Sequence, residues 1–306
     1  MVSMNKLSTE KRAAVVASLV EGNSIRATCR MTGVAKNTVT KLLVDLGTVC
    51  SVYQDRVMRD LPCERIQCDE IWAFVYAKQK NVPEKKRGEA GDVWTFVALD
   101  SDTKLVPTFQ IGPRDQASAL TFMRDVAKRM RNRVQLSTDG FTPYLRAVPE
   151  AFEGDVDYGV LVKQYGTDSD PRRPERRYSP SVVISSDSMK VNGDPEAEHI
   201  STSHVERLNL TMRMSMRRYT RLTNAFSKKV ENLTAAVALH FMHYNFCRVH
   251  QSLKTTPAVA AGVTNHVWTL PELIGLLEEA ERVPVKRGRY AKTRARRGAE
   301  RQDISD

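Results

Sequence analysis

Long apolar runs are missing from this chain of 306 residues, and no window approaches the roughly 18 apolar residues of a membrane-spanning helix. The sequence also lacks the G-x-x-x-x-G-K-[ST] pattern of a phosphate-binding loop, so we expect no nucleotide cofactor. Its five cysteines are odd in number and scattered, which argues against a disulfide framework and favours a reducing compartment. No stretch of signal-peptide kind is visible near the start. We therefore expect a cytoplasmic protein with no membrane partner.

Acidic residues are in deficit. The chain has 47 Lys and Arg against 36 Asp and Glu, which gives a formal net charge of +11. An excess of this size favours a polyanionic partner, and nucleic acid is the first one to consider. Charge alone leaves open a basic protein without such a partner.

Residues 1–50 are predicted to form a separate all-α domain. Ser8 can cap a helix that runs to Val20, a short helix follows Ser24, and a third runs from Lys36 to about Leu46 after a turn at Gly33. This order is the helix-turn-helix pattern of DNA-binding domains, and a three-helix protein-docking module is the alternative. The third helix would present these residues to the major groove: Lys36, Asn37, Thr38 and Lys41.

From residue 65 the pattern changes to strands. Three runs rich in Val, Ile and aromatics (65–78, 93–99 and 105–111) precede a helical segment at 117–130, and strands at 134–137 and 158–163 flank a helix at 141–152. This order predicts a mixed α/β sheet with helices on its faces, in the ribonuclease H-like arrangement, over residues 60–257. Within it, 165–203 is rich in Pro, Arg and Ser and is interpreted as an insertion that approaches DNA. Residues 258–306 would form a C-terminal helix and a basic tail.

Three acidic residues stand where a metal-dependent nuclease core would place them: Asp69, Asp139 and Glu206. A carboxylate at the end of a buried strand is costly unless it is paired or binds a cation. Two magnesium ions, for which manganese can substitute, could activate the attacking oxygen and stabilise the leaving oxygen of a phosphodiester.

Each acid also has a simpler explanation. Asp139 could belong to a turn with Gly140, Glu206 could be a solvated residue of a first helical turn, and Asp69 could pair with Arg65. Glu70 is a weaker candidate because it alternates to the opposite face of its strand from Asp69, and Asp100 is a rival that a turn explains. A zinc site is a weaker possibility still, because the spacing of its four candidates is too wide: Cys63, Cys68, His199 and His204.

In four short segments the chain resembles a DDE transposase, most closely the insertion-sequence-1 transposase family. The segments are Cys68-Asp69-Glu70-Ile71-Trp72, Trp94-Thr95-Phe96-Val97-Ala98-Leu99-Asp100, Ser137-Thr138-Asp139-Gly140 and His204-Val205-Glu206-Arg207-Leu208-Asn209. A further block, from Tyr244 through Arg248 and His250 to Pro257, is similar to the end of the wider integrase core. The sequence departs from the family in having no cysteine-rich zinc element before its helix-turn-helix.

The resemblance implies metal-dependent cleavage at transposon ends and joining of the 3′ hydroxyl to target DNA, with Asp69, Asp139 and Glu206 as the catalytic acids. It further implies a homo-oligomer on double-stranded DNA, associated with the nucleoid in a prokaryote. Residues predicted to contact DNA, or in two cases to orient the acid, are Arg207, Asn209, Arg213, Arg248 and His250. Two alternatives stay open: a nuclease that cuts without joining, and a transposase-derived DNA-binding regulator.

Overall fold

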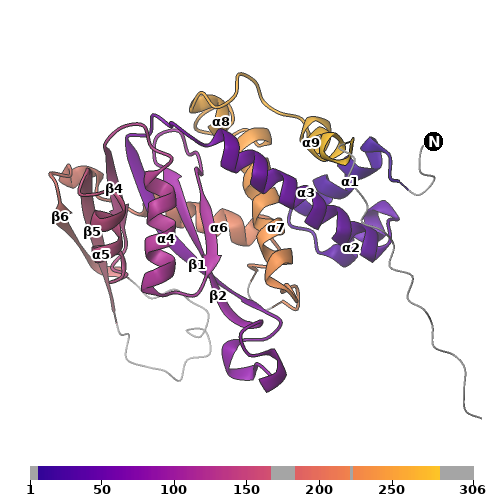
Figure 1. Ribbon diagram of the computed structural model, residues 1–306, viewed down its shortest axis with the longest axis horizontal. Coiled ribbons are helices and arrows are strands. Elements are labelled where there is room, and N and C mark those ends of the chain that lie inside the picture. Colours follow the sequence, from indigo (N-terminus) through magenta and orange to yellow (C-terminus); the bar gives the residue numbers. More distant parts are fainter. Residues whose placement is uncertain (1–5, 167–182, 221–222, 283–306) are drawn as a thin grey trace, which may run out of the picture.

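The described part of the chain contains a mixed sheet of six strands, which forms the left part of the molecule in the view of Figure 1. The computed structural model describes residues 6–166, 183–220 and 223–282. Spatially the strands are ordered β3-β2-β1-β4-β5-β6; β4 runs parallel to β1 and β5, and the other pairs are antiparallel. The first five have the arrangement of the ribonuclease H-like fold that the sequence predicts. The strands are β1 (Arg65–Val75), β2 (Gly91–Asp100), β3 (Phe109–Gly112), β4 (Val134–Thr138), β5 (Val156–Tyr165) and β6 (Val183–Asn192).

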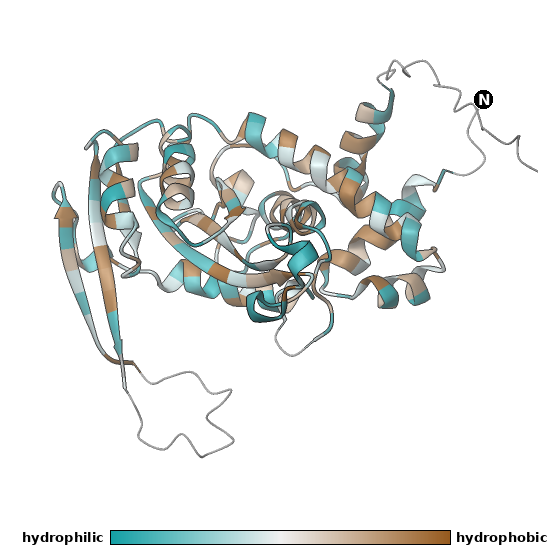
Figure 2. Cartoon of the chain, turned by 60° about the horizontal axis from the view of Figure 1, so that its bottom comes forward, coloured by the Kyte–Doolittle hydropathy of each residue, from teal (hydrophilic) through white to brown (hydrophobic). Residues whose placement is uncertain are grey.

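Helices cover both faces of this sheet, with α4 in front of it and α6 behind it in the view of Figure 1. The helices carry bands of hydrophobic and hydrophilic residues in turn, as Figure 2 shows, which is the pattern of helices with one buried face. None of those described is long and apolar enough to cross a membrane. The helices are α1 (Thr9–Val20), α2 (Ile25–Thr32), α3 (Lys36–Val57), α4 (Gln116–Ala127), α5 (Tyr144–Ala151), α6 (Ser203–Ser215), α7 (Val230–Met242), α8 (Pro257–Ala260) and α9 (Leu270–Arg282).

The third helix is much longer than predicted. The prediction that it ends near Leu46 is wrong, because its buried face continues through Cys50 and Gln54 to Val57, where it packs along α7. The two backbones touch at Gly47, where a Cβ would lie 2.1 Å from the carbonyl oxygen of Ala235. The boundary expected at residue 50 therefore falls inside a helix, and the N-terminal helices share one hydrophobic core with the rest of the chain.

The third strand is shorter than predicted, starting at Phe109 and not at Leu105. Val106 lies before it and forms its hydrogen bonds with a side chain: Asn245 accepts from the Val106 amide at 3.0 Å and donates to its carbonyl at 2.9 Å. A buried asparagine that pairs with both backbone groups replaces a neighbouring strand at this point.

Part of the predicted insertion at 165–203 belongs to the sheet. Within it, β6 runs ten residues along the outer edge of β5. The Pro- and Arg-rich segment at 171–177 lies outside the described residues, and so does the basic tail at 286–297.

Candidate active site

Asp69 and Asp139 come together because their strands are parallel neighbours. β1 and β4 are in register at Cys68 and Thr138, so the next residue of each strand is an aspartate. β4 ends there while β1 continues to Val75, so the two carboxylates lie beside each other where β4 ends next to the middle of β1. Oxygen atoms of Asp69, Asp139 and Glu70 all lie within 4.8 Å of one another.

Glu70 joins this cluster although strand alternation places it on the other face of β1. Beyond Thr138 no described strand continues along the β4 side of β1, although β2 pairs with β1 on its other side as far as Val75. The end of β4 therefore leaves this side of β1 open at residues 69 and 70. The Glu70 side chain is only 1% exposed, and its carboxylate accepts from Nε of Arg114 at 3.1 Å. The sequence made Glu70 a weaker candidate than Asp69 because of strand alternation, and the structure places both side chains in the same group of acids.

Arg114 connects the acids to the aromatic wall of the site. Besides its contact with Glu70, its Nη2 lies 3.9 Å from Oδ2 of Asp139. Its guanidinium also stacks 3.9 Å from the ring centre of Phe141 and 5.0 Å from that of Trp94. A planar cation held in this way fixes Glu70 and leaves part of its own surface facing the cleft.

Glu206 lines the same cleft from the first turn of α6. Its carboxylate accepts from the Thr202 hydroxyl at 2.6 Å and forms an ion pair with Lys163 of β5. It stands outside the group of acids that share the 4.8 Å separation, and Lys163 balances its charge. Asp69 and Asp139 are therefore gathered closely, and Glu206 faces them from the rim.

Two side chains fix α6 against the central strand. Gln67, two residues before Asp69 on the same strand face, accepts hydrogen bonds from the first helical amides of His204 and Val205 at 2.9 and 3.1 Å. Further along the helix, Nδ2 of Asn209 donates to Oδ2 of Asp69 at 2.8 Å. Asn209 is buried, so of its two predicted roles this geometry favours orienting the acid over contacting DNA.

The cleft between these elements has a volume of about 930 Å³ and is open to solvent. Burial and repulsion from Asp139 raise the pKa of Asp69 to about 7, and burial likewise raises the pKa of Glu70 to about 7. Four carboxylates thus face three cations, Arg114, Lys163 and Arg213. Binding of a further cation to a site with this excess of negative charge is favourable. Its lining residues include Asp69, Arg114, Asp139, Phe141, Lys163, Thr202, Glu206, Asn209 and Arg213.

Most of the other predicted DNA contacts lie on the surface, away from the acids. The four residues at the start of α3 are exposed, and so are Arg207 and Arg248. Arg213 lines the cleft, while His250 accepts or donates a hydrogen bond with Ser252 at 2.9 Å. The exposed residues of α3 are Lys36, Asn37, Thr38 and Lys41.

The rival residues have structural partners of their own. Asp100 accepts hydrogen bonds from the amides of Asp102 and Thr103 at 3.2 Å and so closes the turn that the sequence predicts. The two cysteines proposed as zinc ligands, Cys63 and Cys68, are buried and belong to neither metal-ligand cluster found among the described residues.

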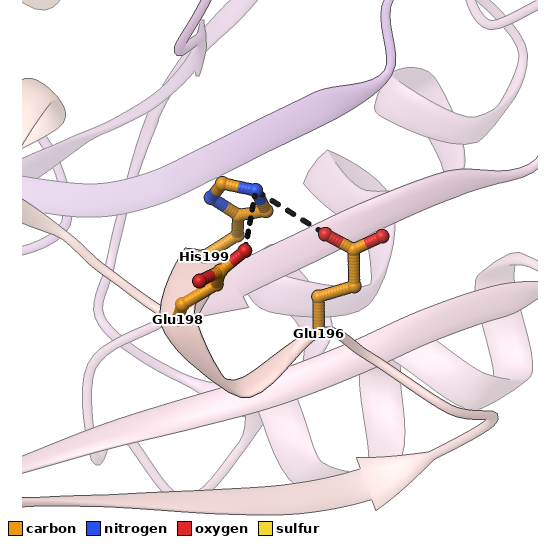
Figure 3. Close-up of side chains that lie close together, drawn as sticks. All are labelled: Glu196, Glu198 and His199. Atoms are coloured by element: carbon orange, nitrogen blue, oxygen red, sulfur yellow. Dashed lines mark ion pairs between the residues drawn. The ribbon is translucent and has the colours of Figure 1, made fainter.

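A second cluster contains Glu196, Glu198 and His199, shown in Figure 3. Nε2 of His199 faces both carboxylates, at 3.2 Å from Glu196 and 3.6 Å from Glu198. The same nitrogen lies 2.9 Å from Nη1 of Arg65, so a guanidinium already occupies the position next to it. Both carboxylates are largely exposed, and we do not regard this cluster as the reactive centre.

No family model matches the chain, and no curated protein matches it. Among solved structures the chain is similar to a piggyBac transposase in its synaptic complex with hairpin DNA, at 9% identity and a TM-score of 0.41, covering 93% of this chain and 75% of that one. It is also similar to the Mos1 strand transfer complex, at 10% identity and a TM-score of 0.33, covering 91% of this chain and 80% of that one.

Proposed function

We propose that the protein is a metal-dependent DNA transposase of the DDE type, which cleaves at transposon ends and joins the 3′ hydroxyl to target DNA. The observation that carries this proposal is the convergence of Asp69 and Glu70, in the middle of β1, with Asp139 at the end of the parallel strand β4. Glu206 lies across the same cleft. The assignment to the insertion-sequence-1 family, on DNA in the nucleoid, belongs to the same proposal.

The donor set suits a hard divalent cation. Magnesium prefers carboxylate oxygens and keeps several of its waters, and the cleft offers carboxylates beside an open volume. Asp69, Asp139 and Glu206 would hold the ions, and manganese could substitute for magnesium. When bound, the ions would lower the pKa of the attacking water or hydroxyl and stabilise the leaving oxygen.

The residues around the acids supply orientation and charge. Asn209 holds one oxygen of Asp69, and the Glu70 amide donates to the other at 2.8 Å, so the carboxylate plane is fixed from both sides. Arg114 and Arg213, which line the cleft, can bind the non-bridging oxygens of a phosphodiester. Lys163 forms an ion pair with Glu206 at the rim of the cleft. This ion pair would have to break for Glu206 to bind a metal ion.

Double-stranded DNA is the substrate that this cleft and the net charge of +11 favour. Joining two transposon ends requires two active sites, so we propose a homo-oligomer assembled on DNA. The helix-turn-helix residues at the start of α3 would recognise the ends.

A strand-transfer assay tests the proposal. Labelled duplexes that carry the inverted repeats flanking the coding region are incubated with magnesium and a supercoiled target. The account predicts nicked and joined products, both lost with Asp139→Asn. Nicking without joining would favour the nuclease alternative. Unchanged activity of the variant would remove Asp139 from the chemistry.

A further inference from the structure

A second cleft lies between the helix-turn-helix segment and the catalytic core. It has a volume of about 760 Å³ and is lined by the starts of α2 and α3 on one side and by the segment between α6 and α7 on the other. None of its residues belongs to the acid cluster. Only Lys36, at its edge, is among the residues that the sequence predicts to contact DNA.

The lining of this cleft carries charge of one sign. Five cations contribute to it, and no acidic side chain does among the described residues. Such a concentration of positive charge attracts polyanions and is weakened by salt. The cations are Arg26, Lys36, Arg217, Arg218 and Lys228.

Arg218 is the unusual member of this set. It is partly buried, and its Nε donates to the Ser227 hydroxyl at 2.8 Å. No carboxylate pairs with it in the part of the chain that the structure describes, and desolvation lowers the pKa of its guanidinium. Desolvating a cation without an opposite charge costs free energy, which an arriving anion would offset.

The N-termini of three helices line this cleft. Ser24 and Ile25 begin α2, Lys36 begins α3, and Asn232 lies in the first turn of α7; all four residues line the cleft. The N-terminal end of a helix carries a partial positive charge and free amide groups, both of which favour anions.

The walls of the cleft are held in place by close packing. Gly22, at the end of α1, lies so near α6 that a Cβ on it would be 2.7 Å from the carbonyl oxygen of Met214. On the other wall, the ring of Phe226 packs 4.9 Å from that of Phe74, and the Tyr76 amide donates to the Ser227 carbonyl at 2.8 Å. The cations are therefore presented by fixed backbone from two parts of the chain.

We propose that this cleft binds the phosphate backbone of duplex DNA, between the residues that read the transposon end and the site that cuts it. Three observations favour an anion over a neutral ligand: the charge of the five cations, the lack of a carboxylate partner for Arg218 among the described residues, and the three helix N-termini. Lys36 makes the cleft continuous with the predicted recognition helix. This inference rests on the proposed function, because it takes DNA as the substrate.

The test measures binding without catalysis. The full chain is titrated with a fluorescent linear duplex of arbitrary sequence, in EDTA, at several salt concentrations, and log K is plotted against log salt. Each lost phosphate contact should reduce the slope by about 0.9, which at 0.1 M salt is about eightfold in affinity. Arg218→Gln tests the buried cation, while Arg26→Gln and Lys228→Gln test exposed members whose loss leaves folding intact.

Lys128→Gln is the matched control, because Lys128 is an exposed cation at the end of α4, outside this cleft. The proposal predicts a reduced slope of log K against log salt for each cleft variant and the parent's slope for the control. Slopes equal to that of the parent for Arg26→Gln and Lys228→Gln would overturn it, and so would an equal loss in the control. Because EDTA removes the metal, a failure of strand transfer leaves this result unaffected, so the two proposals fail separately.

Discussion

The charge of Asp69 should lower the free energy of unfolding of the metal-free protein. The pKa of its carboxyl is about 7 in the folded chain and near 3.8 in an unfolded one. That difference corresponds to about 4 kcal/mol, an upper bound for a strongly interacting group. Below about pH 4 both states hold the proton and there is no penalty. As pH rises from 4 to 7 the unfolded chain loses its proton first, so the free energy of unfolding falls, and it levels off above 7.

Asp69→Asn removes the charge and keeps the shape. The substituted amide can still accept from the Glu70 amide, and its NH₂ group would meet Asn209, whose Oδ1 is buried and has no hydrogen-bond partner among the described residues. Rotation of the Asn209 amide would let that oxygen accept the new donor. We therefore expect the variant to be more stable than the parent at pH 8 in EDTA, by up to about 4 kcal/mol.

Urea unfolding followed by circular dichroism, from pH 5 to pH 8 in EDTA, measures this effect. Between pH 5 and pH 8 the free energy of unfolding of the parent should fall by about 2–3 kcal/mol, and that of Asp69→Asn should fall by less. Magnesium should then stabilise the parent and have little effect on the variant. Asp100→Asn is the control, a buried acid outside the cleft whose replacement should leave the magnesium response intact. A variant that is less stable than the parent at pH 8 in EDTA would refute the reasoning.

Other substitutions test separate contacts. Asn209→Ala should slow strand cleavage about ten- to a hundredfold in single-turnover kinetics with saturating DNA. Without the hydrogen bond that orients Asp69, the activation free energy should rise by about 1–3 kcal/mol. Glu70→Gln should lower activity less than Asp139→Asn in the same assay, since Glu70 is paired with Arg114. Gly47→Val should destabilise the protein by more than about 3 kcal/mol in a urea titration, because α3 and α7 would have to separate at Ala235.

The sheet could be predicted from the sequence because its strands carry their own signal. Runs of β-branched and aromatic residues, broken by turn residues, fixed the order of five strands, and parallel pairing then brought Asp69 beside Asp139. The ends of the elements were harder to predict. The length of α3 depends on α7, nearly 200 residues further along the chain, and the start of β3 depends on the side chain of Asn245.

The sequence predicted that Asp69 and Asp139 would lie together, and it did not predict the cations around them. Nothing in the sequence near Arg114 or Lys163 indicates that these two segments reach the acids, because tertiary contacts decide it. The basic cleft that contains Arg218 was missed for the same reason, since one wall comes from residues 23–40 and the other from residues 217–232.

Anomalous diffraction from crystals soaked in manganese would test the central claim most directly. The account predicts a peak within coordination distance of both Asp69 and Asp139, absent from Asp139→Asn crystals. A peak only at Glu196 and His199, or no peak between the two aspartates at saturating manganese, would contradict it.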